Sequence, residues 1–201
     1  MRVLPSNVSR SDQELVSLLR RAEPRAFAQV YERYSARLLG FLLRLTGRRD
    51  VAEDVFQNTW CSLAEASCQL NPAADLYGWL LRVARNDYYD HRRREVRSKE
   101  VALSDAAAVQ SIASVITMPD QASAAREECL ALERALLALS DVDREVLLLV
   151  GVEGISHERS AEVLGIAEPT MRKRLSRARE RLEQQLDQLQ AEPTSIRRSM
   201  Q

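Results

Sequence analysis

The sequence has few of the residues from which metal sites are built. It holds only 3 cysteines and 2 histidines in 201 residues. Cys61, Cys68 and Cys129 form no close pair, and neither His91 nor His157 lies near them in the sequence. Zinc sites are recognised by closely spaced Cys and His ligands, so we expect no metal and no cofactor. Free cysteine is often buried, so we expect Cys61 and Cys68 to be small buried thiols, and we assign no redox role.

The sequence also lacks an excess of either charge and any long apolar run. With 29 basic and 29 acidic residues the net charge is zero, so any nucleic-acid binding must come from local patches. The longest aliphatic run, residues 146–150, is far too short for a bilayer, and residues 1–11 lack the apolar core of a signal peptide. We therefore expect a cytoplasmic protein with no stable membrane insertion.

What the sequence does contain is a helix pair in its C-terminal part. Ser156 stands where a helix N-cap belongs, and Gly165 tolerates the left-handed conformation that ends a helix. Pro169 then fits the first turn of a second helix, where its missing N–H costs nothing. Residues 155–189 therefore predict a helix-turn-helix. The second helix has one continuous apolar face: Met171, Leu175, Ala178, Leu182, Leu186 and Leu189.

The outer face of that second helix is basic. A helix of about 10–12 Å diameter fits the major groove of duplex DNA, where arginine pairs with guanine edges and phosphates. We expect this helix to read duplex DNA. Its only acidic residue over 172–181 is Glu180. The basic residues of its first turns are Arg172, Lys173, Arg174, Arg177, Arg179 and Arg181.

The N-terminal part is helical as well. Ser11 and Glu14 form a capping box that starts a first helix, and an apolar pattern of helical period continues to Gly47, which ends it. Asp50 opens a further helix, and a turn at Asn71 precedes another. The sequence thus predicts an all-α fold.

Aromatic residues are confined to this N-terminal part, because all ten lie in the first 89 residues. Adjacent helical side chains point about 100° apart, so Tyr88 and Tyr89 are not both expected to be buried. An exposed tyrosine flanked by Arg85, Arg92 and Arg93 makes a stacking platform for unpaired bases beside phosphate-binding cations. The two parts would then bind two states of DNA. Other bulky aromatics are expected in the core: Phe27, Phe41, Phe56 and Trp79.

A linker separates the two parts. Residues 98–124 lack aromatics, carry more acids than bases and contain Pro119. Apolar residues at helical spacing over 109–116 allow a short helix that docks on a partner. We expect two small helical domains joined by a flexible linker: a disordered leader at 1–11, an N-terminal domain at 12–97, the linker at 98–124, the helix-turn-helix domain at 125–191 and a disordered tail at 192–201.

The C-terminal part resembles a known family. The run Asp143-Arg-Glu-Val-Leu-Leu-Leu, followed by Gly154-Ile-Ser, Ala161-Glu-Val-Leu-Gly-Ile and residues 170–182, is similar to the minus-35-reading domain of extracytoplasmic-function sigma factors. Ser160 departs from the family pattern, which usually has Ile or Leu there, and Pro169 replaces a glycine or small polar residue. An unpaired buried hydroxyl costs roughly 1–3 kcal/mol, so we expect Ser160 to hydrogen-bond within its helix or to lie at a partly wet edge.

The N-terminal part resembles the other domain of the same family. The similar runs are residues 27–34, 50–60, 78–86 and 90–94, so the two matches together cover about four-fifths of the chain in the family's order. The pair Tyr88-Tyr89 departs from the family, which often has smaller aliphatic residues there. The resemblance implies a sigma factor: no enzyme, but a monomer when free that binds core RNA polymerase, promoter DNA and an anti-sigma factor.

The resemblance also implies which residues meet each partner. Polymerase binding is implied for Asp50, Glu53, Asp54 and Gln57. Binding of the melted minus-10 element is implied for Asn71, Arg82, Arg85, Asn86, Tyr89, Arg92 and Arg93. Binding of the duplex minus-35 element is implied for His157, Thr170, Arg172, Lys173, Arg174, Ser176, Arg177 and Arg179.

Two other functions fit parts of the pattern. A conventional helix-turn-helix regulator would use its N-terminal domain for dimerisation or sensing, and would bind paired half-sites about 34 Å apart. An enzyme with a basic substrate-binding face is the third interpretation. The sequence has no nucleophile–base pair, metal cluster or glycine-rich phosphate loop, which argues against the enzyme.

Overall fold

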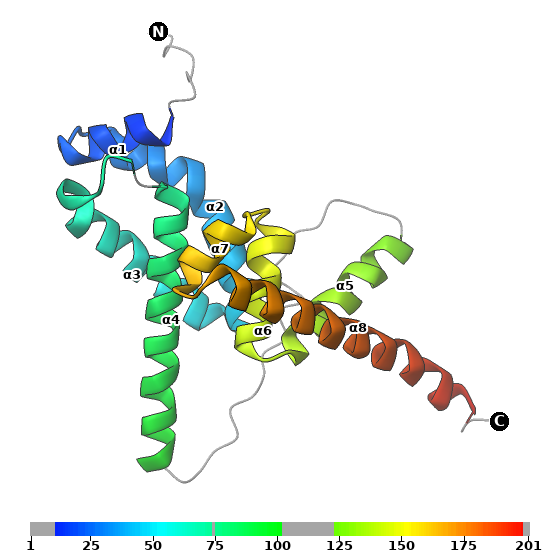
Figure 1. Ribbon diagram of the computed structural model, residues 1–201. Helices are drawn as coiled ribbons and strands as arrows, with labels where there is room; N and C mark the ends of the chain where they lie inside the picture. The colour runs from blue at the N-terminus through cyan, green and yellow to red at the C-terminus, as the bar shows by residue number, and fades with distance from the viewer. Residues whose placement is uncertain (1–10, 74, 102–122, 199–201) are drawn as a thin grey trace, which may run out of the picture.

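The computed structural model describes residues 11–73, 75–101 and 123–198, and these contain helices and no strand (Figure 1). The predicted all-α fold is confirmed. The elements are α1 (Asp12–Arg20), α2 (Ala26–Thr46), α3 (Arg49–Ala66), the 3-10 turn η1 (Ser67–Gln69), α4 (Leu76–Val101), α5 (Ser123–Ala138), α6 (Asp141–Leu147), the π-helical turn η3 (Leu148–Val152), α7 (His157–Leu164) and α8 (Glu168–Arg198).

Local capping fixes several helix ends where the sequence predicts them, although the helix expected to run on to Gly47 is divided into α1 and α2 by a turn at 21–25. The Glu14 backbone N–H donates to the Ser11 hydroxyl, and the Ser11 N–H donates to the Glu14 carboxylate, which completes the capping box of α1. The Ser156 hydroxyl caps α7 by accepting from the backbone N–H of Arg159, without the reciprocal bond. Gly47 closes α2 and Gly165 closes α7, with left-handed φ angles of 67° and 65°.

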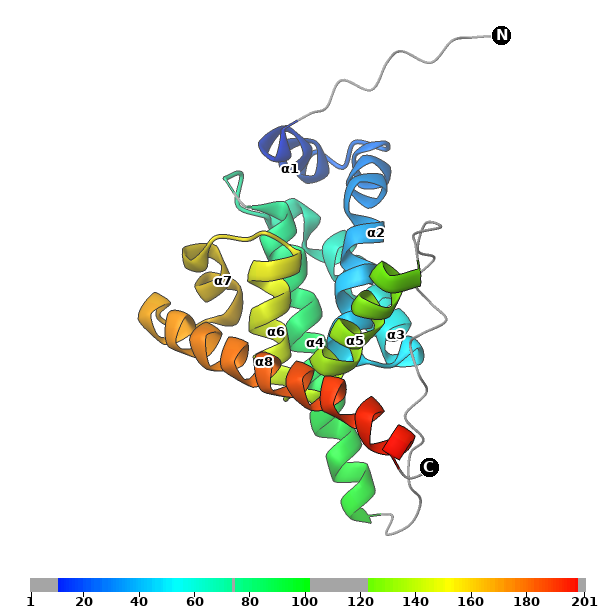
Figure 2. The same ribbon diagram turned by 90° about the vertical axis from the view of Figure 1, so that its right-hand side faces the viewer.

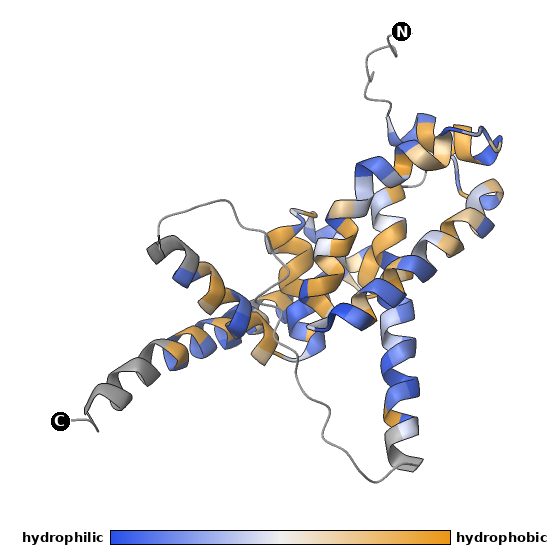
Figure 3. Cartoon of the chain, turned by 180° about the vertical axis from the view of Figure 1, so that it is seen from behind, coloured by the Kyte–Doolittle hydropathy of each residue, from blue (hydrophilic) through white to orange (hydrophobic). Residues whose placement is uncertain are grey.

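The N-terminal and C-terminal halves share one core. Helices α2, α3 and α4 pack together, and α8 packs on α5, α6 and α7 (Figure 2). The halves also pack on each other, because α2 contacts α5, α6 and η3, and α4 contacts α7. Leu38 of α2, Leu80 of α4 and Leu149 of η3 are completely buried in one cluster. Figure 3 shows this apolar centre, and the more hydrophilic distal part of α4 extends beyond it.

The helices extend further than expected at both domain edges. Helix α4 runs to Val101, into the predicted linker 98–124, and α5 begins at Ser123. Helix α8 runs to Arg198, so a disordered tail from residue 192 is not what the structure shows. The leader 1–10 and residues 102–122, including the predicted helix at 109–116, lie outside the described residues.

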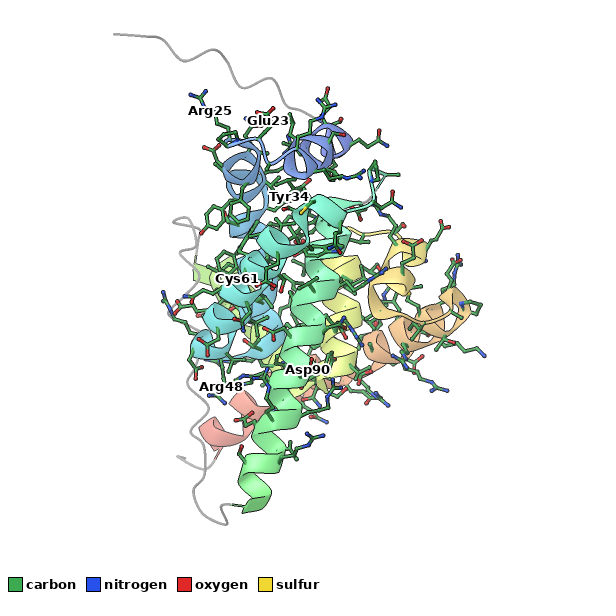
Figure 4. All side chains as sticks on the ribbon, turned by 90° about the vertical axis from the view of Figure 1, so that its left-hand side faces the viewer. Glu23, Arg25, Tyr34, Arg48, Cys61 and Asp90 are labelled. Atoms are coloured by element: carbon green, nitrogen blue, oxygen red, sulfur yellow. The ribbon has the colours of Figure 1, made fainter. Side chains whose placement is uncertain are left out.

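Three burial predictions need correction. Cys61 and Cys68 are exposed and Cys129 is half-buried; Cys61 follows the buried Thr59 and Trp60 and points off the outer face of α3 (Figure 4). Ser160 is fully buried, yet its hydroxyl has no hydrogen-bond partner among the described residues, so the expected bond is absent. Among the four predicted core aromatics only Phe41 is fully buried, while Phe27, Phe56 and Trp79 are partly buried.

Candidate nucleic-acid and polymerase interfaces

The outer face of α8 is a basic surface held on a rigid base. Met171, Leu175 and Ala178 are buried and fix the first turns of α8 against the rest of the C-terminal half. On the opposite side Lys173 and Arg177 are exposed, and neither forms an ion pair within the described residues. Thr170 and Arg179 are exposed on the same helix. This part of α8 can therefore approach another molecule without first breaking internal bonds.

The other α8 residues of the predicted minus-35 set lie at the edges of this surface. Arg172 donates from Nε and Nη2 to Glu168 Oε1, at 2.9 and 2.6 Å, which orients it along the first turn of α8. The Ser176 hydroxyl donates to Glu180 Oε1 at 3.3 Å, and Arg174 is half-buried. His157, at the start of α7, joins a groove of about 340 Å³ whose other lining side chains include Arg172, Ser176 and Arg179.

The predicted polymerase face is the exposed side of α3. Asp54 and Gln57 are exposed, whereas Asp50 pairs with Arg48 at 2.7 Å and Glu53 pairs with Arg49 at 2.7 Å. The hydrogen bond from Arg48 holds the pKa of Asp50 below its ordinary value. Asp54 and Gln57 also line a polar groove of about 160 Å³ with side chains of α4. The four predicted residues thus lie along one acidic helix face.

The predicted minus-10 face of α4 is covered by the C-terminal half. Arg82 Nη2 donates to the backbone carbonyl of Glu162 at 2.9 Å. Arg85 Nε lies 2.8 Å from Glu145 Oε1, an ion pair that lacks the alignment of a hydrogen bond. Tyr89 donates its hydroxyl to the other oxygen of the same carboxylate, at 3.0 Å. All three residues therefore contact the C-terminal half, although Arg82 stays exposed and Arg85 and Tyr89 are only half-buried.

Arg92 continues this row further along α4. Its Nε lies 3.3 Å from Asp141 Oδ2. The remaining predicted minus-10 residues contact their own half instead. Asn71 accepts a hydrogen bond from the Ala73 N–H at 3.0 Å, the exposed Asn86 accepts one from Arg85 at 3.3 Å, and Arg93 pairs with Asp90.

The expected stacking platform at Tyr89 is not open in this conformation. Tyr88 is 2% exposed, and Tyr89 is half-buried with the Arg85 guanidinium 4.9 Å from its ring centroid. Burial raises the pKa of Tyr89 above its ordinary value. Burial also raises the pKa of Glu145 to about 7, in spite of its contacts with Arg85 and Tyr89. Tyr88 and Tyr89 are not both buried, as expected, but Tyr89 is only partly exposed because the C-terminal half packs over this side of α4.

A cleft lies between the halves above this covered face. Its volume is about 490 Å³, and its lining includes Asn71, Trp79 and Arg82 from the N-terminal half and Arg159 and Val163 from α7. Asn71 and Arg82 therefore line the same cleft, and α7 forms its opposite wall.

Sequence reasoning missed the acidic residues that join the halves. Glu153, directly after η3, has a 4% exposed side chain and accepts hydrogen bonds from Arg37 Nε and the Tyr77 hydroxyl, both at 2.7 Å. Asp75 pairs with Arg159. Glu145 and Glu153 flank the apolar run 146–152 in the sequence. An acid next to a buried apolar run was the one local signal that these carboxylates would lie between the halves.

The described residues contain no group of three or more His, Cys, Asp or Glu side chains that could hold a metal ion. No described helix combines the length and the apolar character that a bilayer crossing requires.

Comparison with known proteins gives matches over both halves. The family model sigma-70 region 2 matches residues 30–98, and sigma-70, region 4 matches residues 129–182. The chain is 32% identical over 174 residues to the ECF RNA polymerase sigma factor SigM of Mycobacterium tuberculosis, across 86% of this chain and 83% of the relative. It is 28% identical over 183 residues to the RNA polymerase sigma-H factor of Pseudomonas aeruginosa, across 89% and 95%.

A solved structure agrees with these sequence matches. The sigma factor RpoE of Bartonella quintana, in complex with the anti-sigma factor NepR, superposes with a TM-score of 0.69 at 28% identity. The match covers 81% of this chain and 98% of that one. Both halves therefore have counterparts in one solved chain.

Proposed function

Because the chain belongs to the extracytoplasmic-function sigma factors and directs promoter recognition by bacterial RNA polymerase, we propose which surface meets each partner. First, we assign binding of the duplex minus-35 element to the outer face of α8. The observation that carries it is the exposed basic surface of Lys173, Arg177 and Arg179 on a helix whose opposite side is buried. Forked cationic donors on a rigid helix are suited to base edges and phosphates in the major groove.

Second, we assign binding of the melted minus-10 element to α4 and the loop before it. Arg82, Arg85 and Tyr89 project from one side of α4, and Asn71 lines the same cleft as Arg82. Cations for phosphates beside an aromatic ring for base stacking are the elements of a single-strand site. This face becomes available when the C-terminal half moves away.

Third, we assign binding of core RNA polymerase to the exposed side of α3. Asp54 and Gln57 are exposed there, beside Asp50 and Glu53. An acidic and amide-bearing helix face suits a basic partner surface. The chain acts as a monomer on polymerase, in the cytoplasm, and has no catalytic residues of its own.

An anti-sigma factor is proposed as a fourth partner. RpoE of Bartonella quintana, which matches both halves of this chain, is held in a complex with the anti-sigma factor NepR. A protein that binds this chain while the α4 face is covered would keep it from promoters. Co-purification of a tagged chain from its native host, with and without stress, tests this partner.

Reconstituted transcription tests the proposed function as a whole. The chain is added to core polymerase and fragments of bacterial genomic DNA, and run-off transcripts are sequenced. We expect transcripts from a small set of promoters that share two elements, and none without the chain. A conventional regulator would instead bind DNA as a dimer at paired half-sites and would start no transcript with core enzyme alone.

A further inference from the structure

The first turn of α8 has a fixed backbone. The N–H groups of Thr170 and Met171 both donate to the Ala167 carbonyl at 3.0 Å, and the Met171 side chain is completely buried. Pro169 lies in this turn and restricts its own φ angle. Helix α7 packs against α8, and Figure 2 shows the first turns of α8 beside α7 at the edge of the molecule. A side chain that leaves this turn therefore starts from a defined position.

Glu168 and Arg172 form an ion pair across this turn. Arg172 donates from Nε at 2.9 Å and from Nη2 at 2.6 Å, and both hydrogen bonds end on Glu168 Oε1. The Arg172 side chain is nevertheless 63% exposed. A glutamate four residues before a cation stabilises a helix only slightly. The larger consequence of this pair is therefore the orientation that it gives to an exposed guanidinium.

The pair occupies one edge of the Arg172 guanidinium and leaves another edge free. Nε and Nη2 form the side edge, which Glu168 holds. The end edge consists of Nη1 and the second hydrogen of Nη2, and it has no hydrogen-bond partner within the described residues. Two parallel donors of this kind match the O6 and N7 acceptors of guanine in the major groove. Glu168 thus leaves free an edge that can bind a guanine.

Two other cations of the α8 surface have no such support. Lys173 and Arg177 are exposed, and neither forms an ion pair in the part of the chain that the structure describes. A long side chain without a partner loses rotamer freedom when it binds, and this loss weakens the contact. Arg172 loses less of this freedom, because Glu168 orients it before DNA arrives.

We propose that Glu168 is a specificity-determining residue of the minus-35 surface: it positions Arg172 so that the end edge of the guanidinium binds one guanine of the duplex. The proposal rests on the assignment of α8 to the minus-35 element. Glu168 itself contacts no base, and its negative charge repels the DNA phosphates. It therefore lowers the affinity for every sequence while it raises the preference for sequences that carry the guanine. A residue that only stabilised the helix would not have this pair of effects.

Glu168→Ala is the principal variant, with Glu183→Ala as its matched control. Glu183 is an exposed acid of the same helix, lines the same groove as Arg172 and has no ion pair within the described residues. Each variant loses one negative charge on the side of α8 that would face DNA. Far-ultraviolet circular dichroism checks that both keep the helicity of the wild type.

The probe is a promoter recovered by the run-off transcription assay, with the base pairs of its upstream element randomised. Holoenzyme is assembled from core polymerase and each variant, and is bound to this pool of duplexes. Sequencing of the bound fraction gives the base preference at every position. Titration of the whole pool gives the overall affinity.

We expect both variants to bind the pool more tightly than the wild type, and only Glu168→Ala to lose base preference. The preference for guanine at one position should fall by at least about threefold, and Arg172→Ala should lose preference at the same position. The double variant should lose no more than Arg172→Ala, because Glu168 acts only through Arg172. Glu168→Gln should keep part of the preference, since its amide oxygen still accepts a hydrogen bond.

Three results would overturn the proposal, and they differ in what they say about the proposed function. If Glu168→Ala keeps every base preference while Arg172→Ala loses one, Glu168 does not position Arg172, and the assignment of α8 stands. If Arg172→Ala weakens binding to all sequences alike, Arg172 binds a phosphate, and the assignment of α8 then depends on Arg177→Ala. If the wild type recovers no promoter with core polymerase, the proposed function is wrong and this proposal is wrong with it.

Discussion

Arg144 Nη1 donates to the backbone carbonyl of Leu45 at 2.6 Å, and so joins α6 of one half to the last turn of α2 in the other. The same guanidinium donates to three carbonyls at the end of α5, those of Leu136, Leu137 and Leu139. Burial lowers the pKa of Arg144 from its ordinary value. These carbonyls lie at helix ends, where intrahelical donors run out; that of Leu136 has a further donor, the Leu139 N–H at 3.1 Å.

Arg144→Met should therefore destabilise the whole chain. Methionine fills a similar volume but donates nothing, so buried carbonyls lose their partners, and each such loss costs roughly 1–3 kcal/mol. We expect the free energy of unfolding in urea to fall by about 3–5 kcal/mol. Arg134→Met, at an exposed position of α5, should change it by less than about 0.5 kcal/mol. Equal stability of the two variants would show that the carbonyls find other donors.

Arg177→Ala should reduce both promoter affinity and discrimination. If Arg177 pairs with a base edge, its loss costs about 1–3 kcal/mol and relaxes sequence preference at one position. Arg179→Ala, nearer the flank, should weaken all sequences alike and lower the salt dependence, as expected of a phosphate contact. Binding of holoenzyme to a library of minus-35 variants at several salt concentrations separates the two. An unchanged preference in Arg177→Ala would contradict the assignment of α8.

The double variant Asp54→Ala, Gln57→Ala should lose affinity for core polymerase without losing structure. Both side chains are exposed on α3, so far-ultraviolet circular dichroism should not change. Loss of two partner contacts should weaken binding by about 1–3 kcal/mol in a pull-down titration with core enzyme. Glu65→Ala, exposed near the end of the same helix, serves as the control. Reduced helicity in the double variant would point to a structural role instead.

The helix ends could be predicted from the sequence because their causes are local. Ser11 and Ser156 cap the turn that follows them, and Gly47 and Gly165 end the helix that precedes them. The basic face of α8 could be predicted for the same reason, since helical period alone gathers its residues. Neither inference needs knowledge of the rest of the chain.

The covered face of α4 could not be predicted, because its partners are distant in the sequence. Tyr89 bonds to a residue 56 positions away, and Arg37 to one 116 positions away. An outward-facing arginine has the same helical pattern whether water, DNA or a second domain lies opposite. The predicted linker also gave no reason to expect the halves to pack together, so Tyr89 was expected at the surface.

Stability should fall as the pH rises through neutrality, because of Glu145. Its folded pKa is raised from 4.5 to about 7 by burial, which outweighs the opposing effects of Arg85, Tyr89 and Arg174. Between these two values the folded chain binds a proton that the unfolded chain does not. Unfolding therefore becomes easier as the pH rises in this window, and the penalty reaches its full size, at most roughly 3 kcal/mol, above the folded pKa.

Glu145→Gln should remove this pH dependence. Urea unfolding of both proteins at pH 5, 6, 7 and 8 gives the difference in stability, to which the groups that the two proteins share contribute equally. We expect the wild type to lose stability relative to the variant by about 1–3 kcal/mol from pH 5 to pH 8. A difference that does not vary with pH would mean that Glu145 is ionised throughout, held by Arg85 and Tyr89.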